Sequence, residues 1–180
     1  MTSKTSKKHK AMAPKSVRAA VLTVSDSKFD YLWSKSKNLE ETEDVSGGYL
    51  IDSLKKAGHE VVFYTIAPDH EGVILEMIDH IAATYSPDVI ITTGGTGVSG
   101  RDVTVEAVRA IFEKELEGFG EIFRRKSYER LGEIALLTRA VAGVYSDTLI
   151  FALPGSPDAV ETGVGIILKE LGHLVKHVRE

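Results

Sequence analysis

The feature that most constrains the fold is the alternation of short apolar, β-branched segments with segments of helical periodicity. The candidate strands in the first half are residues 17–24 (VRAAVLTV), 60–66 (EVVFYTI) and 88–93 (DVIITT). Between them, residues 48–58 and 72–85 each place their apolar side chains on one helical face. Strands buried on both faces and joined by helices form a parallel sheet that is covered on two sides. The pattern therefore predicts an α/β fold, a three-layer αβα sandwich with a mostly parallel sheet.

The second half of the chain continues this pattern, except that one strand is expected to run antiparallel to its neighbour. Residues 103–116 and 118–132 have helical spacing, and residues 153–178 run from a loop into a closing helix. Residues 140–145 and 148–153 flank only Ser146 and Asp147, which is typical of two strands joined by a tight turn. We therefore expect one antiparallel strand near an edge of the sheet, within a single domain over residues 17–180.

Residues 1–16 differ from this domain in composition. They contain five lysines, no acidic residue and almost no large apolar side chain, so we predict a disordered basic tail. Without those lysines, 17 basic residues stand against 26 acidic ones, a net charge of −9 that would repel nucleic acid. No segment approaches the ~20 apolar residues of a membrane span. The absence of cysteine excludes disulfides and thiol chemistry and predicts a cytoplasmic protein.

A glycine-rich segment, residues 91–102 (ITTGGTGVSGRD), spells G-x-G-x-x-G from Gly95 to Gly100. A dinucleotide-binding fingerprint would follow the first strand, with an acidic residue ~20 positions later at the end of the next strand. This loop follows the third strand, and the acidic residues near that distance lie in a helical segment. A Walker A loop would need Gly-Lys-Ser/Thr, which is absent. Neither nucleotide motif explains the loop.

Two interpretations of this loop remain. The glycines form a tight strand-to-helix turn capped by Asp102, or their backbone N–H groups bind a phosphate at the start of a helix. Four glycines together with Thr96 and Ser99 exceed what a turn requires, which favours a phosphate-binding loop. Residues 44–48 (DVSGG) and 153–157 (LPGSP) place glycines at two further helix starts, so they are candidates for the same role.

Acidic residues accompany these loops. Asp26, Asp69 and Asp102 each follow a candidate strand or precede a helix, where capping alone explains many aspartates. Beside phosphate-binding loops, however, two or three carboxylates are what Mg²⁺ needs. The combination of these aspartates with the loops favours nucleotide chemistry at the edge of the sheet where the carboxyl ends of the parallel strands meet.

Two other features are candidates for a functional role. Residues 27–48 form a long polar connection that contains Trp33, a candidate interface anchor, lid contact or packing residue. His173 and His177 are four residues apart near the end of the last helix, where interaction with the helix dipole is favoured over a metal site.

Six motifs cover nearly the whole chain in a defined order and spacing: VLTVSDS, DVSGGYL, IAPD, ITTGGTG followed by RDVT, GFGE and LPGSPDA. They resemble the molybdopterin adenylyltransferases of molybdenum cofactor biosynthesis. The resemblance implies that the terminal phosphate of molybdopterin attacks the α-phosphorus of ATP in the presence of Mg²⁺, giving adenylylated molybdopterin and pyrophosphate. It also implies a homo-oligomer, for which we favour a hexamer over a trimer, and a molybdate-inserting protein as a partner.

The motifs also carry residue roles. Asp69 and Asp102 match the two acids that the family needs for catalysis, which makes them the candidate Mg²⁺ ligands. The candidate molybdopterin- and nucleotide-binding residues are Ser25, Asp26, Asp44, Ser46, Gly47, Gly94, Gly95, Thr96, Gly97, Ser99, Pro154 and Gly155. The alternative is a binding module of the same fold that holds molybdopterin without adenylylating it, and the eventual metal is molybdenum or tungsten.

Overall fold

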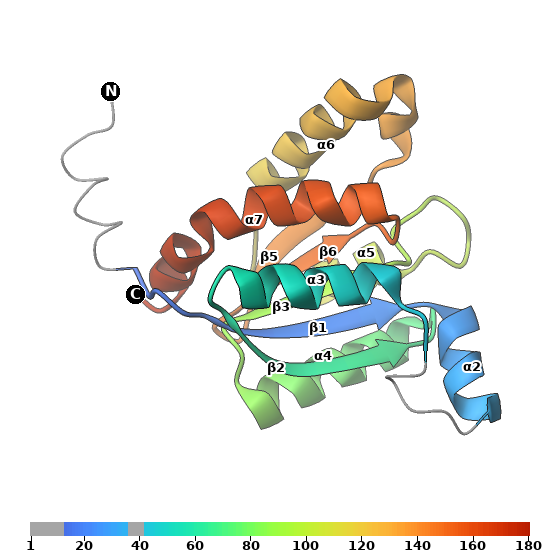
Figure 1. Cartoon of the computed structure of the whole chain (residues 1–180), viewed down its shortest axis with the longest axis horizontal. Coiled ribbons are helices and arrows are strands. Elements are labelled where there is room, and N and C mark those ends of the chain that lie inside the picture. Colours follow the sequence, from blue (N-terminus) through green and yellow to red (C-terminus); the bar gives the residue numbers. More distant parts are fainter. Residues whose placement is uncertain (1–12, 36–41) are drawn as a thin grey trace.

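The computed structural model describes residues 13–35 and 42–180. The predicted disordered tail falls mainly on residues 1–12, which lie outside the described residues. The described part of the chain contains a six-stranded sheet in the order β2-β1-β3-β6-β5-β4 (Figure 1). Its strands are β1 (Arg18–Val24), β2 (Glu60–Ala67), β3 (Val89–Thr93), β4 (Lys114–Glu115), β5 (Val141–Tyr145) and β6 (Thr148–Leu153). The helices are α2 (Asp26–Lys35), α3 (Val45–Lys56), α4 (Glu71–Tyr85), α5 (Thr104–Ile111), α6 (Glu117–Leu131), the 3₁₀ helix η2 (Gly132–Leu137) and α7 (Pro157–Val178).

The sheet is mostly parallel, as the sequence predicts. β2, β1, β3 and β6 pair in parallel, whereas β5 runs antiparallel to both of its neighbours, β6 and β4. The turn between β5 and β6 places Ser146 at φ 47° and Asp147 at φ 60°. Two consecutive positive φ angles are typical of a type I′ hairpin turn. The predicted antiparallel strand is confirmed, one position in from the edge.

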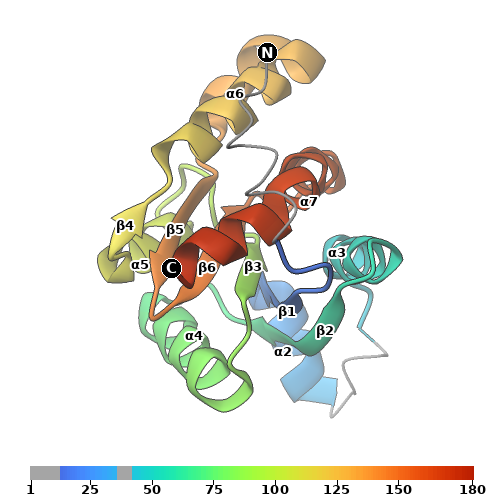
Figure 2. The ribbon, with the colours of Figure 1, turned by 90° about the vertical axis from the view of Figure 1, so that its left-hand side faces the viewer.

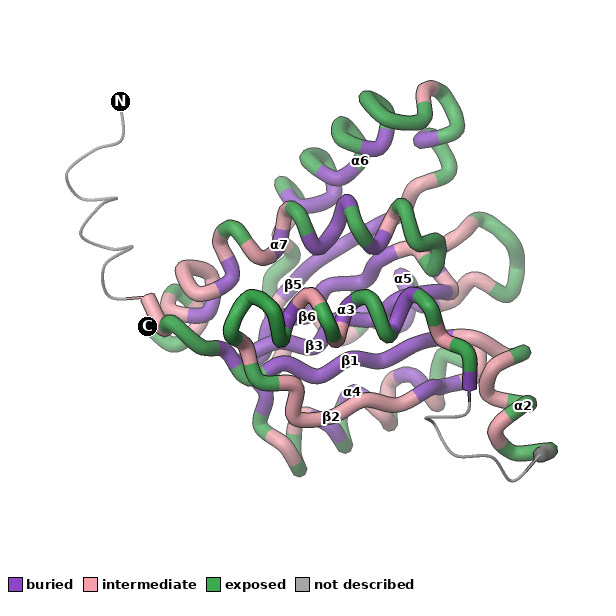
Figure 3. Tube along the Cα trace, in the orientation of Figure 1, coloured by how far each residue is buried: buried purple, intermediate pink, exposed green. Residues whose placement is uncertain are grey.

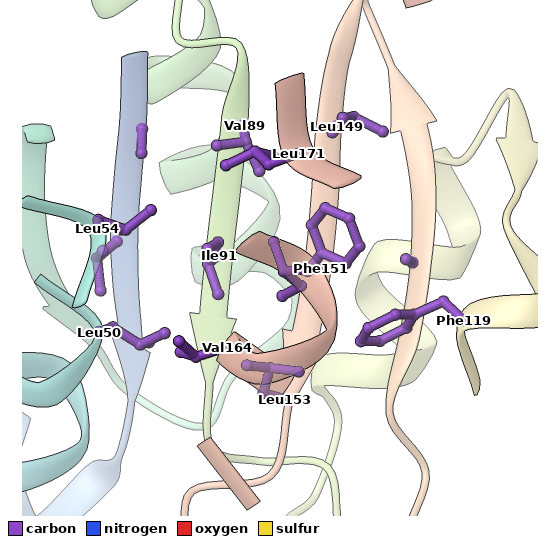
Figure 4. Close-up of a cluster of buried hydrophobic side chains, with 14 of the residues drawn as sticks. Leu50, Leu54, Val89, Ile91, Phe119, Leu149, Phe151, Leu153, Val164 and Leu171 are labelled. Carbon is purple, nitrogen blue, oxygen red and sulfur yellow. The ribbon is translucent and has the colours of Figure 1, made fainter. Parts of the chain in front are cut away.

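Helices cover both faces of the sheet and complete three layers (Figure 2). α3, α6 and α7 pack on one face, and α4 and α5 pack on the other. Alternate residues of β1 serve the two cores: Ala19 and Val21 lie in the first, Ala20 and Leu22 in the second. Figure 3 shows β1, β3 and β6 as continuously buried strands. In the first core, Phe151 of β6 lies among the side chains of α7 and the neighbouring strands (Figure 4).

Tertiary contacts override one of the local patterns. The helix predicted over residues 103–116 ends at Ile111, and Lys114 and Glu115 instead pair with β5. A Cβ on Gly143 of β5 would lie 2.4 Å from the Phe112 ring, so that ring packs directly on a strand position with no side chain. The connection after β1 contains helix α2, in which Trp33 is 74% exposed. No helix in the described ranges is both long and apolar enough to span a membrane.

Candidate functional site

The carboxyl ends of the four parallel strands meet at one edge of the sheet, and the segments that follow them are joined by hydrogen bonds. The backbone N–H of Asp26 donates to Oδ2 of Asp69, and the backbone N–H of Asp69 donates to Oδ1 of Asp26, both at 2.9 Å. After β3, Gly94 N–H donates to the Leu153 carbonyl of β6 at 3.0 Å. The predicted convergence of these segments is therefore observed.

The glycine loop after β3 approaches its neighbours too closely for side chains. Gly94 has φ +106°, and an added Cβ there would lie 2.1 Å from the Val24 carbonyl oxygen. Gly95 has φ +61°, within the left-handed region that other residues rarely adopt. A Cβ on Gly155 would lie 3.2 Å from the Gly94 Cα, so the loops after β3 and β6 touch backbone to backbone. These glycines are required by geometry beyond a simple turn.

Two side-chain oxygens face the same small space beside Gly95. A Cβ at Gly95 would lie 2.4 Å from Thr104 Oγ1 and 2.8 Å from Asp69 Oδ1. Thr104 is fully buried, and its hydroxyl has no hydrogen-bond partner among the described residues. Burial raises the pKa of Asp69, and the nearby charges of Asp26 and Asp102 raise it further. A cation in this space would offset that repulsion and supply a partner for the hydroxyl.

The pKa of Asp102 is shifted in the opposite direction, downward. Its Oδ2 accepts hydrogen bonds from Ser99 N–H at 2.9 Å and Ser99 Oγ at 2.6 Å. The bond from the Ser99 hydroxyl is the main reason that the pKa of Asp102 is lowered. A Cβ on Gly97 would lie 2.7 Å from Asp102 Oδ2. Asp102 therefore stays ionised and also fixes the second half of the loop.

Arg139 holds this loop in place through hydrogen bonds to two of its backbone carbonyl oxygens. Its guanidinium donates to the carbonyl oxygens of Thr96 and Asp102, both at 3.2 Å, and forms an ion pair with Glu106. Contact with Arg139 lowers the pKa of Glu106. Sequence reasoning missed Arg139, because the residue is separated from the loop by more than 35 positions and belongs to no motif.

Two cavities open around the loop. The larger, about 360 Å³, lies between the loop, α6, η2 and the start of α7. Its lining residues are Gly94, Gly95, Thr96, Gly97, Asp102, Ser127, Arg130, Leu131, Ile134, Leu137, Thr138, Pro154, Gly155, Ser156, Asp158, Ala159 and Thr162. The smaller, about 110 Å³, shares Gly94 and Gly155 with it and is lined in addition by Thr23, Val24, Ser25, Lys28, Asp44, Ser46 and Thr93.

Most of the candidate residues thus lie around one pair of cavities, but their roles differ. Asp44 caps α3, and its carboxylate accepts hydrogen bonds from Gly47 N–H, Thr23 Oγ1 and Tyr64 Oη at 3.1, 2.6 and 2.7 Å. Ser46 Oγ donates to the Gly155 carbonyl at 2.7 Å, tying α3 to the loop after β6. These contacts give Asp44, Ser46 and Gly47 positioning roles. None of Asp26, Asp69 and Ser99 lines either cavity.

The wall of the larger cavity opposite the loop was not identified from the sequence. It is apolar, formed by Leu131, Ile134 and Leu137 of α6 and η2. Arg130 lies at its rim, donating to Thr162 Oγ1 and pairing with Asp158 and Glu161 of α7. The only signal for this wall was the apolar run after the predicted helix, which contains no residue with distinctive chemistry.

The fold and site define an αβα-sandwich protein with a glycine-rich pocket at the carboxyl edge of a mostly parallel sheet. Residues 20–173 match the family described as "Probable molybdopterin binding domain", and the chain belongs to that family. This confirms the family resemblance that the six motifs indicate.

Named relatives align over nearly their whole length. A "Probable molybdopterin adenylyltransferase" of Methanocaldococcus jannaschii is 45% identical over 92% of this chain and 96% of its own. A "Molybdopterin adenylyltransferase" of Pyrococcus furiosus is 44% identical over 96% of this chain and 97% of its own. The crystal structure of the tungsten cofactor synthesizing protein MoaB from Pyrococcus furiosus superposes with a TM-score of 0.80 at 42% identity, covering 93% of this chain and all of that one.

Proposed function

We propose that this protein adenylylates molybdopterin with Mg-ATP, as a step in molybdenum or tungsten cofactor biosynthesis. The names of its relatives support the reaction class. The observation that carries the proposal is the loop at Gly94–Gly97, where backbones approach closely. Asp69 and the buried Thr104 hydroxyl face the space beside Gly95, and Asp102 lies against Gly97 at the larger cavity. No nucleophilic side chain is needed, because nucleotidyl transfer asks a protein mainly for positioning and charge neutralisation.

In the proposed reaction, a terminal phosphate oxygen of molybdopterin forms a bond to the α-phosphorus of ATP. The bond from that phosphorus to the bridging oxygen breaks, and pyrophosphate leaves with the electron pair. Backbone N–H groups of the glycine loop would bind phosphate oxygens, and the apolar wall of Leu131, Ile134 and Leu137 would contact a ring system of a substrate. Arg139 would hold the loop in position through its bonds to Thr96 and Asp102.

The residues present fit Mg²⁺. Asp69 and Thr104 direct oxygens at the space beside Gly95, and Asp102 adds a second carboxylate at the loop. Oxygen donors with one or two carboxylates are what Mg²⁺ takes, with phosphates and water completing its coordination. When bound, Mg²⁺ would neutralise phosphate charge. Asp69 would be the ligand that gains most, because its ionised form is disfavoured in the protein alone.

We also propose that the protein works as a homo-oligomer, with a hexamer favoured over a trimer. Six large apolar side chains on α6 and η2, which we call the α6–η2 surface, are at least half exposed: Ile122, Tyr128, Leu131, Ile134, Leu136 and Leu137. α6 projects from the body of the molecule (Figure 1). Because three of the six also line the larger cavity, a second copy packed here would help to close that cavity. The product would pass to a molybdate-inserting protein, and the reaction would take place in the cytoplasm.

Incubation with molybdopterin and Mg-ATP tests the proposal, with pyrophosphate and adenylylated pterin measured separately. Both products should form in equal amounts, and omission of Mg²⁺ should abolish both. Tight binding of molybdopterin with no pyrophosphate released would refute adenylylation and indicate a binding module. A reaction mixture without molybdopterin is the control for simple ATP hydrolysis.

A further inference from the structure

Two histidines near the end of α7 direct ring nitrogens at each other. His173 and His177 lie one helical turn apart, and their Nε2 atoms are 3.0 Å apart. Their ring centroids are 4.6 Å apart with the planes at 64°. Both side chains are accessible, with 27% and 47% of their surfaces exposed. The two nitrogens therefore converge on one point at the helix surface that solvent can reach.

A carboxylate lies behind each ring. His173 Nδ1 is 3.4 Å from Glu170 Oε2, and His177 Nδ1 is 3.3 Å from Glu180 Oε2. A carboxylate beside Nδ1 favours the tautomer that carries its proton there, which leaves a lone pair on Nε2. The 3.0 Å separation is that of a hydrogen bond, which needs an Nε2–H on one of the rings; with Nδ1–H on both rings, two Nε2 lone pairs are available to a shared cation.

A shared metal ion fits the same geometry. Metal–imidazole bonds are about 2.0–2.1 Å long, so two nitrogens on one metal at angles between 90° and tetrahedral stand about 2.8–3.4 Å apart. The observed 3.0 Å lies within that range. Histidines at i and i+4 of a helix are a known metal-binding spacing, and carboxylates that orient ligating imidazoles are their usual partners.

We propose that His173 and His177 bind one transition-metal ion of the class that prefers imidazole, such as Zn²⁺, Ni²⁺ or Cu²⁺. No third His, Cys, Asp or Glu in the described ranges joins them in a metal-binding group. Water, or a donor that lies outside those ranges or belongs to another molecule, would complete the coordination. Such a site exchanges its metal more readily than a closed structural site.

This site is separate from the glycine loop. His173 is 16 residues beyond the first residue of α7, about 24 Å along the helix axis. The end of α7 lies at the opposite side of the molecule from the loop at residues 94–102 (Figure 1). An ion bound here would clamp the last turns of α7, in which Leu171 and Val175 pack into the core. It would stabilise the folded protein by mass action.

Titration of the full chain with ZnCl₂ tests the proposal, by calorimetry at neutral pH with millimolar Mg²⁺ present to occupy carboxylate sites. The variants are His173→Gln and His177→Gln. His80→Gln is the matched control, because His80 is also exposed on a helix and has Thr84 rather than a histidine at i+4. Wild type and control should bind one Zn²⁺ per chain at this site, and each test variant should lose at least 10-fold in affinity.

Thermal unfolding gives a second readout. Zn²⁺ should raise the melting temperature of the wild type and of His80→Gln, and this rise should be lost in both test variants. The proposal is overturned if the wild type binds no Zn²⁺, or if either test variant keeps wild-type affinity. Circular dichroism of the metal-free proteins should show the same helix content in all four, since both histidines are at the surface.

Discussion

Replacing Gly95 by alanine should both destabilise the protein and stop its reaction. A non-glycine residue at φ +61° costs about 1–2 kcal/mol. The new methyl group would also lie 2.4 Å from Thr104 Oγ1 and 2.8 Å from Asp69 Oδ1, so a packed side chain must move. Overpacking of this kind costs about 1–3 kcal/mol. The total of about 2–5 kcal/mol is less than the ~5–15 kcal/mol stability of a typical domain, so the variant should still fold.

Gly100→Ala is the matched control in the same loop. Gly100 is exposed, an added Cβ there meets nothing within 4 Å, and its φ is not positive. The control should match the wild type or be up to ~1 kcal/mol more stable. Gly95→Ala should melt about 4–20 °C lower. It should also lose at least ~10²-fold in the rate of adenylylation, because the methyl group fills the space that Asp69 and Thr104 face. Equal melting temperatures and rates in the two variants would refute this account of the loop.

Three further predictions address charge, pH and assembly. Asp69→Asn and Asp102→Asn should each keep molybdopterin affinity nearly intact while the rate of adenylylation falls at least ~10²-fold. Weaker binding with an unchanged rate at saturating substrate would instead indicate that these residues only recognise the substrate. The two acids should have opposite effects in denaturant titrations between pH 3 and pH 7. Asp69 has a raised pKa, so the folded state binds its proton more tightly, and Asp69→Asn should become more stable relative to the wild type as pH rises above the usual value of 3.8. Asp102 has a lowered pKa, so its contribution is present above 3.8 and is lost as pH falls through the lower folded value; Asp102→Asn should therefore be less stable than the wild type at pH 7, with the difference vanishing in acid. For assembly, light scattering should give an oligomer for the wild type and a smaller species for Leu136→Asp, whose side chain is 86% exposed on the α6–η2 surface, whereas a monomeric wild type would contradict the proposal.

The layered fold was predictable because its signals are local. The runs at β1 and β3 are buried along their length apart from Arg18, and β2 is rich in β-branched and aromatic residues although it is only partly buried, so all three are recognisable from their composition. The turn at Ser146 and Asp147 is short enough to specify its own geometry. The helix predicted through residue 116 was wrong at its end, because pairing of Lys114 and Glu115 with β5 is a contact between segments far apart in the chain.

The sequence by itself determined which loops carry the candidate chemistry. Glycines and aspartates that follow strands are local features, and parallel strands bring their carboxyl ends together whatever the detailed packing. Only the tertiary structure decided which of these residues position others and which of them face the cavities. Several features depend on distances and side-chain directions. They are the mutual hydrogen bonds of Asp26 and Asp69, the capping role of Asp44, the hydrogen bonds from Arg139 to the loop, the apolar wall of α6 and η2, and the facing nitrogens of His173 and His177. Those distances are set by packing across the sheet and by the rotamers of side chains on the helices. Local sequence patterns do not encode them.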